Sequence, residues 1–161
     1  MTPRRARAPR GQRAHGAVPR NRGGNTTLVA ALGVGGLGPA MTLAGAADGP
    51  AFAAYVRAFL APALVPGQVV VLDNLSVHKG ATIRRLIAAR GCRLRFLPPY
   101  SPDFAPLEHA FSKVKAHLRR AKARSRDALD AAIATALDTI TAQDAAGWFR
   151  HCGYRPPGQS L

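Results

Sequence analysis

Apolar and polar residues follow two different periods along the chain, and these periods predict strands and helices in turn. Two apolar segments, 26–32 and 40–44, flank a glycine-rich stretch, a pattern typical of a β-hairpin. Pro50 then opens a predicted helix that Pro62 and Pro66 bring to a close, and the apolar residues at helical spacing on its buried face are Phe52, Val56, Phe59, Leu60 and Ala63. The glycines also resemble a phosphate-binding loop, but no Gly-Lys-Ser/Thr sequence follows them, so the hairpin is favoured.

The middle of the chain predicts a pair of parallel strands. The apolar run Val69–Leu72 indicates a buried strand, and residues 92–97 indicate a further short strand. An amphipathic helix over residues 81–89 is expected between them, with Gly91 as its stop. A strand, a helix and a strand in this order favour a parallel pair, in which the strand 69–72 is central.

Three helices are expected after the second strand. The first begins at Pro106, and apolar residues at helical spacing define its buried face while basic residues cover the other faces. Ser125 is expected to cap the second helix. Thr141 and Asp144 have the spacing of a capping box for the last one. The whole order of elements predicts the α/β fold class.

Basic residues greatly outnumber acidic ones. The 161 residues include 23 Lys and Arg against eight Asp and Glu, a formal charge of +15. A nucleic acid is the expected partner, because such an imbalance raises self-repulsion unless a polyanion neutralises it; a charged solubility surface is the alternative. Residues 1–24 are Arg-rich without hydrophobic periodicity and predict an irregular basic arm, followed by one domain over 25–155 and a tail over 156–161.

Cysteine spacing and hydropathy bear on the cellular compartment. Cys92 and Cys152 lie far apart and lack the close pairing of a zinc site, which indicates reduced thiols. No apolar stretch reaches the roughly 18 residues of a membrane span, and the Arg-rich start has no apolar signal core. We therefore expect a cytoplasmic protein without membrane contact.

Two acidic residues stand where a metal ligand would be useful. Asp73 directly follows the strand 69–72, and Glu108 follows Pro106 in the first turn of a helix. If folding brings them together, two carboxylates suit a hard divalent cation. Each also has a simpler explanation, because an Asp after a strand often caps a turn and a helix dipole favours a Glu in the first turn.

The sequence around both carboxylates resembles Tc/mariner-like DDE transposases. Between them lie 34 residues (108 minus 73 minus 1). At this separation their flanking strings are similar to the second and third parts of the DDE catalytic triad, most closely in bacterial insertion-sequence relatives, the IS six-thirty family. The resemblance runs from about Thr26 to Tyr154, and its strings are Leu72-Asp73-Asn74-Leu-Ser-Val-His78 and Leu97-Pro-Pro-Tyr-Ser-Pro-Asp-Phe-Ala-Pro-Leu-Glu108.

This resemblance implies an RNase H-like fold of the retroviral integrase type, a mixed sheet flanked by helices. It further implies metal-dependent DNA cleavage and strand transfer, in which three carboxylates hold two Mg²⁺ (or Mn²⁺) ions that stabilise the entering and leaving oxygens. Asp73 and Glu108 would be catalytic metal ligands, and Asn74 and His78 would orient them or contact the substrate. A homodimer on DNA, associated with the nucleoid, is expected, and the basic residues expected to contact DNA phosphates are Lys113, Lys115, Arg119, Arg120 and Lys122.

The chain departs from the family pattern ahead of Asp73. The first Asp of the triad is expected on the opening strand of the fold, yet the acidic residue nearest before Asp73 is Asp48, after the hairpin, and none precedes it. That strand would lie upstream of Met1, and we expect a fold that lacks its first strand. Its place is between the hairpin and the strand 69–72, so both neighbours should have unpaired backbone, and stability should be marginal.

Three hypotheses follow from these features. The chain is the C-terminal part of a transposase catalytic domain, inactive alone because one triad carboxylate is missing. Alternatively, it is a non-catalytic basic DNA-binding relic, or a modulator that competes with the full-length transposase. In the third, an upstream reading frame supplies the first Asp, by frameshifting or as a complementing N-terminal transposase fragment.

Overall fold

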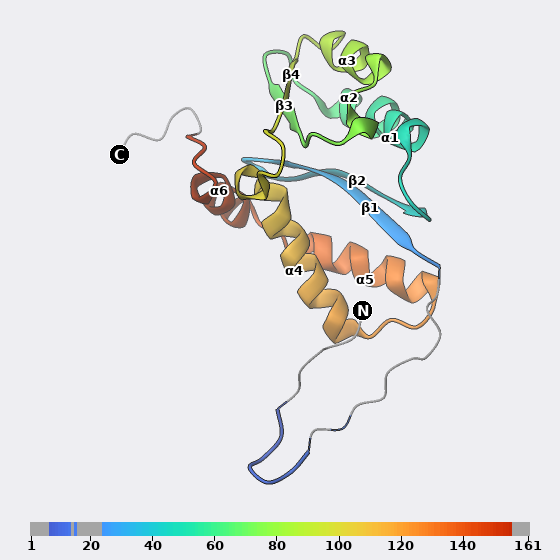
Figure 1. The fold of residues 1–161 in the computed structure, drawn as a ribbon, viewed down its shortest axis with the longest axis vertical. Coiled ribbons are helices and arrows are strands. Elements are labelled where there is room, and N and C mark those ends of the chain that lie inside the picture. The colour runs from blue at the N-terminus through green and yellow to red at the C-terminus, as the bar shows by residue number, and fades with distance from the viewer. Residues whose placement is uncertain (1–6, 14, 16–23, 156–161) are drawn as a thin grey trace.

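The computed structural model of the protein describes residues 7–13, 15 and 24–155 (Figure 1). Residues 7–13 are exposed and lie in neither a helix nor a strand. Residues 1–6, 14 and 16–23 of the predicted arm 1–24, which include four of its seven arginines, fall outside the described residues, as does the predicted tail 156–161. Among the residues that are described, no helix is both long enough and apolar enough to cross a membrane.

The predicted hairpin is present, with a tighter turn than the glycine run suggests. Strand β1 (Thr26–Gly33) pairs antiparallel with β2 (Gly36–Ala44) around a two-residue turn. Gly36 has φ +128°, in the region that favours glycine, which explains why a glycine ends this turn. The register shifts between Ala30 and Leu32, opposite Pro39, which has no N–H to donate to the ladder.

One bent helical segment follows the hairpin. Helix α1 (Gly49–Tyr55) continues into a π-helical turn, η1 (Val56–Leu60), and then into α2 (Ala61–Ala63). Pro62 lacks an N–H, and just before it the Ala61 N–H bonds to the Val56 carbonyl, five residues back. The extra residue in this turn shifts the buried positions by one residue, so that Leu64 is buried and Ala63 is exposed. Phe59 is 44% exposed, and the prediction that it faces the core is wrong.

The predicted parallel strands are confirmed, but their burial is not as expected. Strand β3 (Val69–Leu72) pairs in parallel with β4 (Arg93–Phe96), and α3 (Ala81–Ala88) connects them. In the described chain β3 has β4 as its one partner, so it is an edge strand. Val69 and Val71 are 46% and 40% exposed, and the expectation of a buried central strand is therefore wrong.

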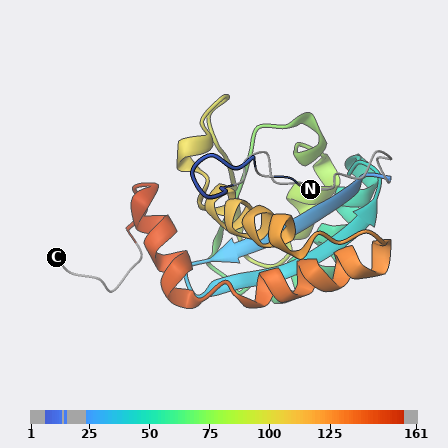
Figure 2. The ribbon, with the colours of Figure 1, turned by 90° about the horizontal axis from the view of Figure 1, so that it is seen from below.

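The three C-terminal helices form as the sequence predicts. They are α4 (Pro106–Ala121), α5 (Arg126–Asp138) and α6 (Ala142–His151). The Ser125 side chain accepts a hydrogen bond from the Ala128 N–H, and Thr141 with Asp144 forms the expected capping box. Seen from below, α4 and α5 lie across one face of the hairpin (Figure 2).

Two hydrophobic clusters lie on opposite faces of the hairpin. Alternate residues of β1 pack against each cluster, because successive side chains of a strand point to opposite faces. The first cluster packs α1, η1 and α3 against Val29 and Ala31. The second packs α4 and α5 against Leu28 and Leu32. The hairpin is thus the middle layer of the molecule.

The two small sheets share the first cluster without pairing to each other. Val29 and Ala31 of β1 and Val70 and Leu72 of β3 pack on the same buried side chains, yet β1–β2 and β3–β4 form separate two-stranded sheets in the described part of the chain. In the described chain, β1 and β3 therefore each have one edge whose backbone is not hydrogen-bonded to another strand. The unpaired backbone that the sequence predicts on these two strands is present.

Candidate active site

Asp73 lies directly after β3, and its neighbours fix one of its carboxylate oxygens. Its side chain is 51% exposed, and the Leu75 N–H donates to Oδ1 at 3.1 Å. The ring nitrogen Nδ1 of His78 makes a short contact with the same oxygen. The His78 ring in turn packs on Phe52, with ring centroids 4.1 Å apart. Oδ1 is thus held on two sides, while Oδ2 has no hydrogen-bond partner among the described residues and is available to a ligand.

Glu108 is the one glutamate of the sequence and stands in the first turn of α4. It is exposed, and its carboxylate has no hydrogen-bond or ion-pair partner within the described chain. Ala105, the residue before the helix, provides no side-chain cap, so the first N–H groups of α4 add a favourable field for a negative charge. This field, and the absence of a partner within the described chain, leave the carboxylate available to a cation.

The backbone connects the two carboxylates through one edge of a sheet. Strands β3 and β4 are parallel and in register to their last residues, Leu72 and Phe96. The next N–H, that of Leu97, donates to the Leu72 carbonyl at 2.8 Å. Asp73 and the loop that leads to Glu108 therefore leave the sheet side by side.

The donor set of this site is that of a hard divalent cation, but it is short of ligands. Asp73 and Glu108 offer carboxylate oxygens, the ligands that Mg²⁺ and Mn²⁺ prefer. Within the described residues no group of three or more His, Cys, Asp or Glu side chains comes together as a metal site. Asn74 beside Asp73 is partly buried, and its amide has no hydrogen-bond partner in the described chain.

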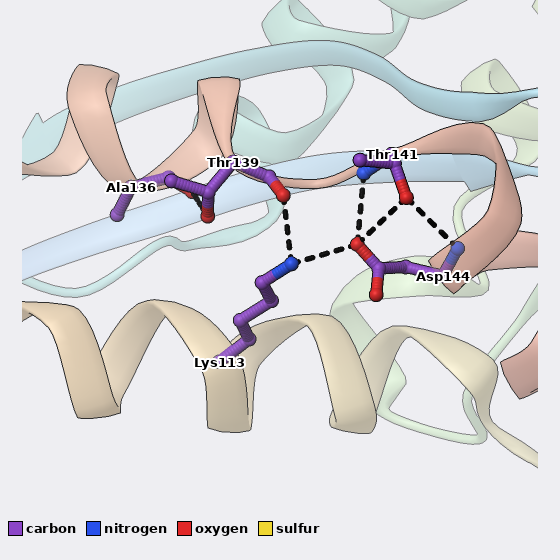
Figure 3. Close-up of polar contacts among 5 residues, drawn as sticks. All are labelled: Lys113, Ala136, Thr139, Thr141 and Asp144. Atoms are coloured by element: carbon purple, nitrogen blue, oxygen red, sulfur yellow. Dashed lines mark hydrogen bonds and ion pairs between the residues drawn. The ribbon is translucent and has the colours of Figure 1, made fainter.

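The basic residues predicted to contact DNA fall into two groups. Lys115, Arg119, Arg120 and Lys122 are exposed on or just after α4. Lys113 differs, because its ammonium donates to the Thr139 carbonyl and to Asp144 Oδ2, each at 2.7 Å (Figure 3). It joins α4 to the turn between α5 and α6, a role that sequence analysis missed because its partners lie 26 and 31 residues away.

We expect the Lys113 contact to stabilise the fold at neutral pH and to fail in acid. Hydrogen bonds from Lys113 and from Thr141 lower the pKa of Asp144 from 3.8 to about 2. A lowered folded-state pKa gives stability above the unfolded value and loses it as pH falls toward 2. Asp144→Asn should therefore lower the melting temperature at pH 6 and flatten its decline between about pH 4 and 2.

Melting temperatures recorded by circular dichroism from pH 6 to pH 2 would measure this effect. Asp138→Asn is the matched control, since Asp138 is exposed near the end of α5 and has no polar side-chain partner in the described chain. Wild-type and Asp144→Asn curves that stay parallel down to pH 2 would contradict the assignment.

Sequence comparison decides the family of this site. The model of the DDE superfamily endonuclease family matches residues 1–130. The chain belongs to the DDE superfamily endonuclease family. No curated protein sequence matches it significantly.

Solved structures with this DDE fold include three complexes of the Mos1 transposase. The Mos1 strand transfer complex superposes with a TM-score of 0.68 at 18% identity, over 92% of this chain and 45% of that chain. The paired-end complex with the left transposon end gives 0.65 at 17% identity, over 92% and 46%. The Mos1 mariner paired-end complex with Mn gives a TM-score of 0.65 at 18% identity, over 92% of this chain and 46% of that chain. This chain thus spans less than half the length of the Mos1 chains.

The predicted DDE family and the predicted RNase H-like α/β fold class are therefore confirmed. The structural likeness at this identity concerns the fold alone. The insertion-sequence assignment, the domain boundaries and the roles of individual site residues stay predictions.

Proposed function

We propose that this chain is part of the catalytic domain of a DDE transposase, which cleaves DNA and joins its strands with the help of divalent metal ions. The observation that carries the proposal is the position of Asp73. It follows a parallel strand, and that strand end is hydrogen-bonded to the start of the loop leading to Glu108. The family match supports the proposal that this pair is the second and third carboxylates of the DDE triad.

The chain's own residues would then bind and orient. Asp73 and Glu108 would hold Mg²⁺ or Mn²⁺, and His78, backed by Phe52, would keep the Asp73 carboxylate in one orientation. Asn74 has a free amide and would contact the substrate or a ligand of the metal. When bound, two such ions activate the attacking oxygen and stabilise the leaving oxygen of an in-line displacement at phosphorus.

The 161-residue chain alone is proposed to be inactive, because it contributes two of three carboxylates. The third would come on an apolar strand that ends in Asp, placed between β1 and β3. The free ladder edges of these strands and the exposed Val69 and Val71 support this position. An upstream segment or a complementing N-terminal transposase fragment would supply it.

DNA is the proposed partner. The exposed cations of α4 suit phosphate contacts, and the net charge of +15 favours a polyanion. The Mos1 complexes include one with a transposon end, which is what a transposase of this family would bind. We extend the proposal to a homodimer that acts on paired ends, in the cytoplasm and on the nucleoid. Lys113 is the exception among the predicted DNA contacts, since its ammonium is held by Asp144.

Titration with Mn²⁺ tests the proposed metal site on the chain as it stands. Asp73→Asn and Glu108→Gln should each lower the apparent Mn²⁺ affinity by about tenfold or more, because even residues behind metal ligands account for 10- to 100-fold. Free Mn²⁺ can be followed by electron paramagnetic resonance. Asp127→Asn, at an exposed position in the first turn of α5, is the control and should bind as the wild type does.

A second function, from a different class, is that of a non-catalytic DNA-binding relic or modulator. The four exposed cations on or just after α4 favour it as much as they favour the enzyme. It predicts salt-sensitive, sequence-independent DNA binding together with Mn²⁺ affinity that neither Asp73→Asn nor Glu108→Gln changes. That combination of results would overturn the catalytic proposal in favour of the non-catalytic DNA-binding protein.

A further inference from the structure

The loop between β4 and α4, which starts beside Asp73 and leads to Glu108, exposes two aromatic rings. Tyr100 is 102% exposed, as much as in an unfolded reference, and Phe104 is 50% exposed. Leu97, where this loop starts, is bonded beside Asp73, and Glu108 follows four residues after Phe104. Aromatic rings left in water beside a charged site are typical of a binding surface.

The backbone that carries these rings is fixed by its own contacts. Tyr100 has φ 55°, in the left-handed region that a residue with a bulky side chain rarely adopts. Ser101 Oγ donates to the Pro99 carbonyl, and the residues from Pro102 form a 3₁₀ turn closed by the Ala105 N–H. The loop backbone is thus held by its own hydrogen bonds, while the Tyr100 side chain is fully exposed.

A residue from the far end of the chain anchors the same loop. The Tyr154 hydroxyl donates to the Phe104 carbonyl at 2.8 Å, and its ring packs edge-on against Phe149 with centroids 5.5 Å apart. A loop that is held on both sides loses little conformational entropy when a ligand covers its rings, which favours binding. The anchoring therefore suits a surface prepared for a flat ligand.

We propose that Tyr100, assisted by Phe104, stacks on an unpaired nucleobase of the DNA substrate beside the strand held at Asp73 and Glu108, an inference that rests on the proposed function. The chain's charge of +15 selects a polyanionic ligand, and nucleobases are the flat groups that accompany phosphates. In an intact duplex both faces of each base are covered by its neighbours, so a single ring finds a free face only where a base is unpaired or displaced.

The test compares one DNA with and without an unpaired base. A duplex with a single-stranded gap that carries 2-aminopurine reports stacking by fluorescence quenching, and the fully paired duplex measures binding through phosphates alone. Tyr100→Ala should weaken binding to the gapped DNA by about 5- to 150-fold and abolish the quenching. Tyr100→Phe, which keeps the ring, should restore both, and affinity for the paired duplex should stay within about twofold for all variants.

Phe59→Ala is the control, because Phe59 is another exposed aromatic ring, at 44%, but lies on η1. It should quench and bind as the wild type does. The stacking proposal is overturned if Tyr100→Ala quenches 2-aminopurine as strongly as the wild type does. It is also overturned if this variant loses affinity equally for gapped and paired DNA, while DNA binding itself persists. Failure of the wild-type chain to bind either DNA overturns both this inference and the proposed function.

Discussion

Asp73→Asn should lower the rate of DNA cleavage by the complemented domain on the order of a thousandfold, the size seen when one preorganised electrostatic group is removed. The amide keeps the shape of the carboxylate but not its charge, and a hard divalent cation depends on that charge. Glu108→Gln should have the same effect for the same reason. Because the fold surrounding both residues stays intact, the loss would concern the chemistry and not the stability.

Nicking of a supercoiled plasmid in Mg²⁺ or Mn²⁺ would measure this effect. The chain is assayed alone and together with the polypeptide encoded immediately upstream of its Met1 codon, fused or co-expressed. Cleavage is expected only in the second case and only with both carboxylates present, whereas Asp127→Asn should cleave normally. Robust turnover by the isolated chain that survives Asp73→Ala would falsify the assignment of the site.

Ile87→Ala should strongly destabilise the first cluster. Ile87 is 0% exposed and packs among the helices and strands that surround that cluster. Truncation of such a residue costs about 2–5 kcal/mol, or roughly 30- to 5,000-fold in the folding equilibrium, against a total stability of about 5–15 kcal/mol for an ordinary domain. With its sheet divided into two pairs, this chain is expected to have little stability to spare, so the variant should be largely unfolded at 25 °C.

Urea denaturation followed by circular dichroism would give the free energies of unfolding. Ile87→Val should cost only about 0.5–1.5 kcal/mol, because it removes one methylene from the same site. Val65→Ala, at a position 60% exposed, should change stability by no more than about 0.5 kcal/mol. Equal losses for Ile87→Ala and Val65→Ala would show that the first cluster does not support the fold.

Local sequence signals were sufficient for most elements. Two apolar segments around a glycine-rich turn predicted the hairpin, and the caps at Ser125 and Thr141 set the start of two helices correctly. Each of these signals acts between residues a few positions apart, where geometry leaves few alternatives. The positions of Asp73 at a strand end and of Glu108 in a first helical turn were predicted in the same way.

One local irregularity of the backbone and the features that depend on distant parts of the chain were not predictable. The π turn before Pro62 displaced the buried face, and a strict 3.6-residue period therefore assigned Phe59 to the core. Lys113 looked like its basic neighbours until folding placed Asp144 beside it. Burial of β3 was inferred from its apolar run, but burial also needs a neighbouring strand, and β4 alone leaves Val69 exposed.

The middle position of the hairpin limits how the molecule can be dissected. Alternate side chains of β1 pack against both clusters. Removal of the hairpin would therefore uncover apolar side chains of the α1–β4 half and of the α4–α6 half. A fragment that begins after Ala44 would expose both interiors to water at once and should aggregate. We therefore expect that a fragment able to fold must contain at least the residues from Thr26 to the end of α6.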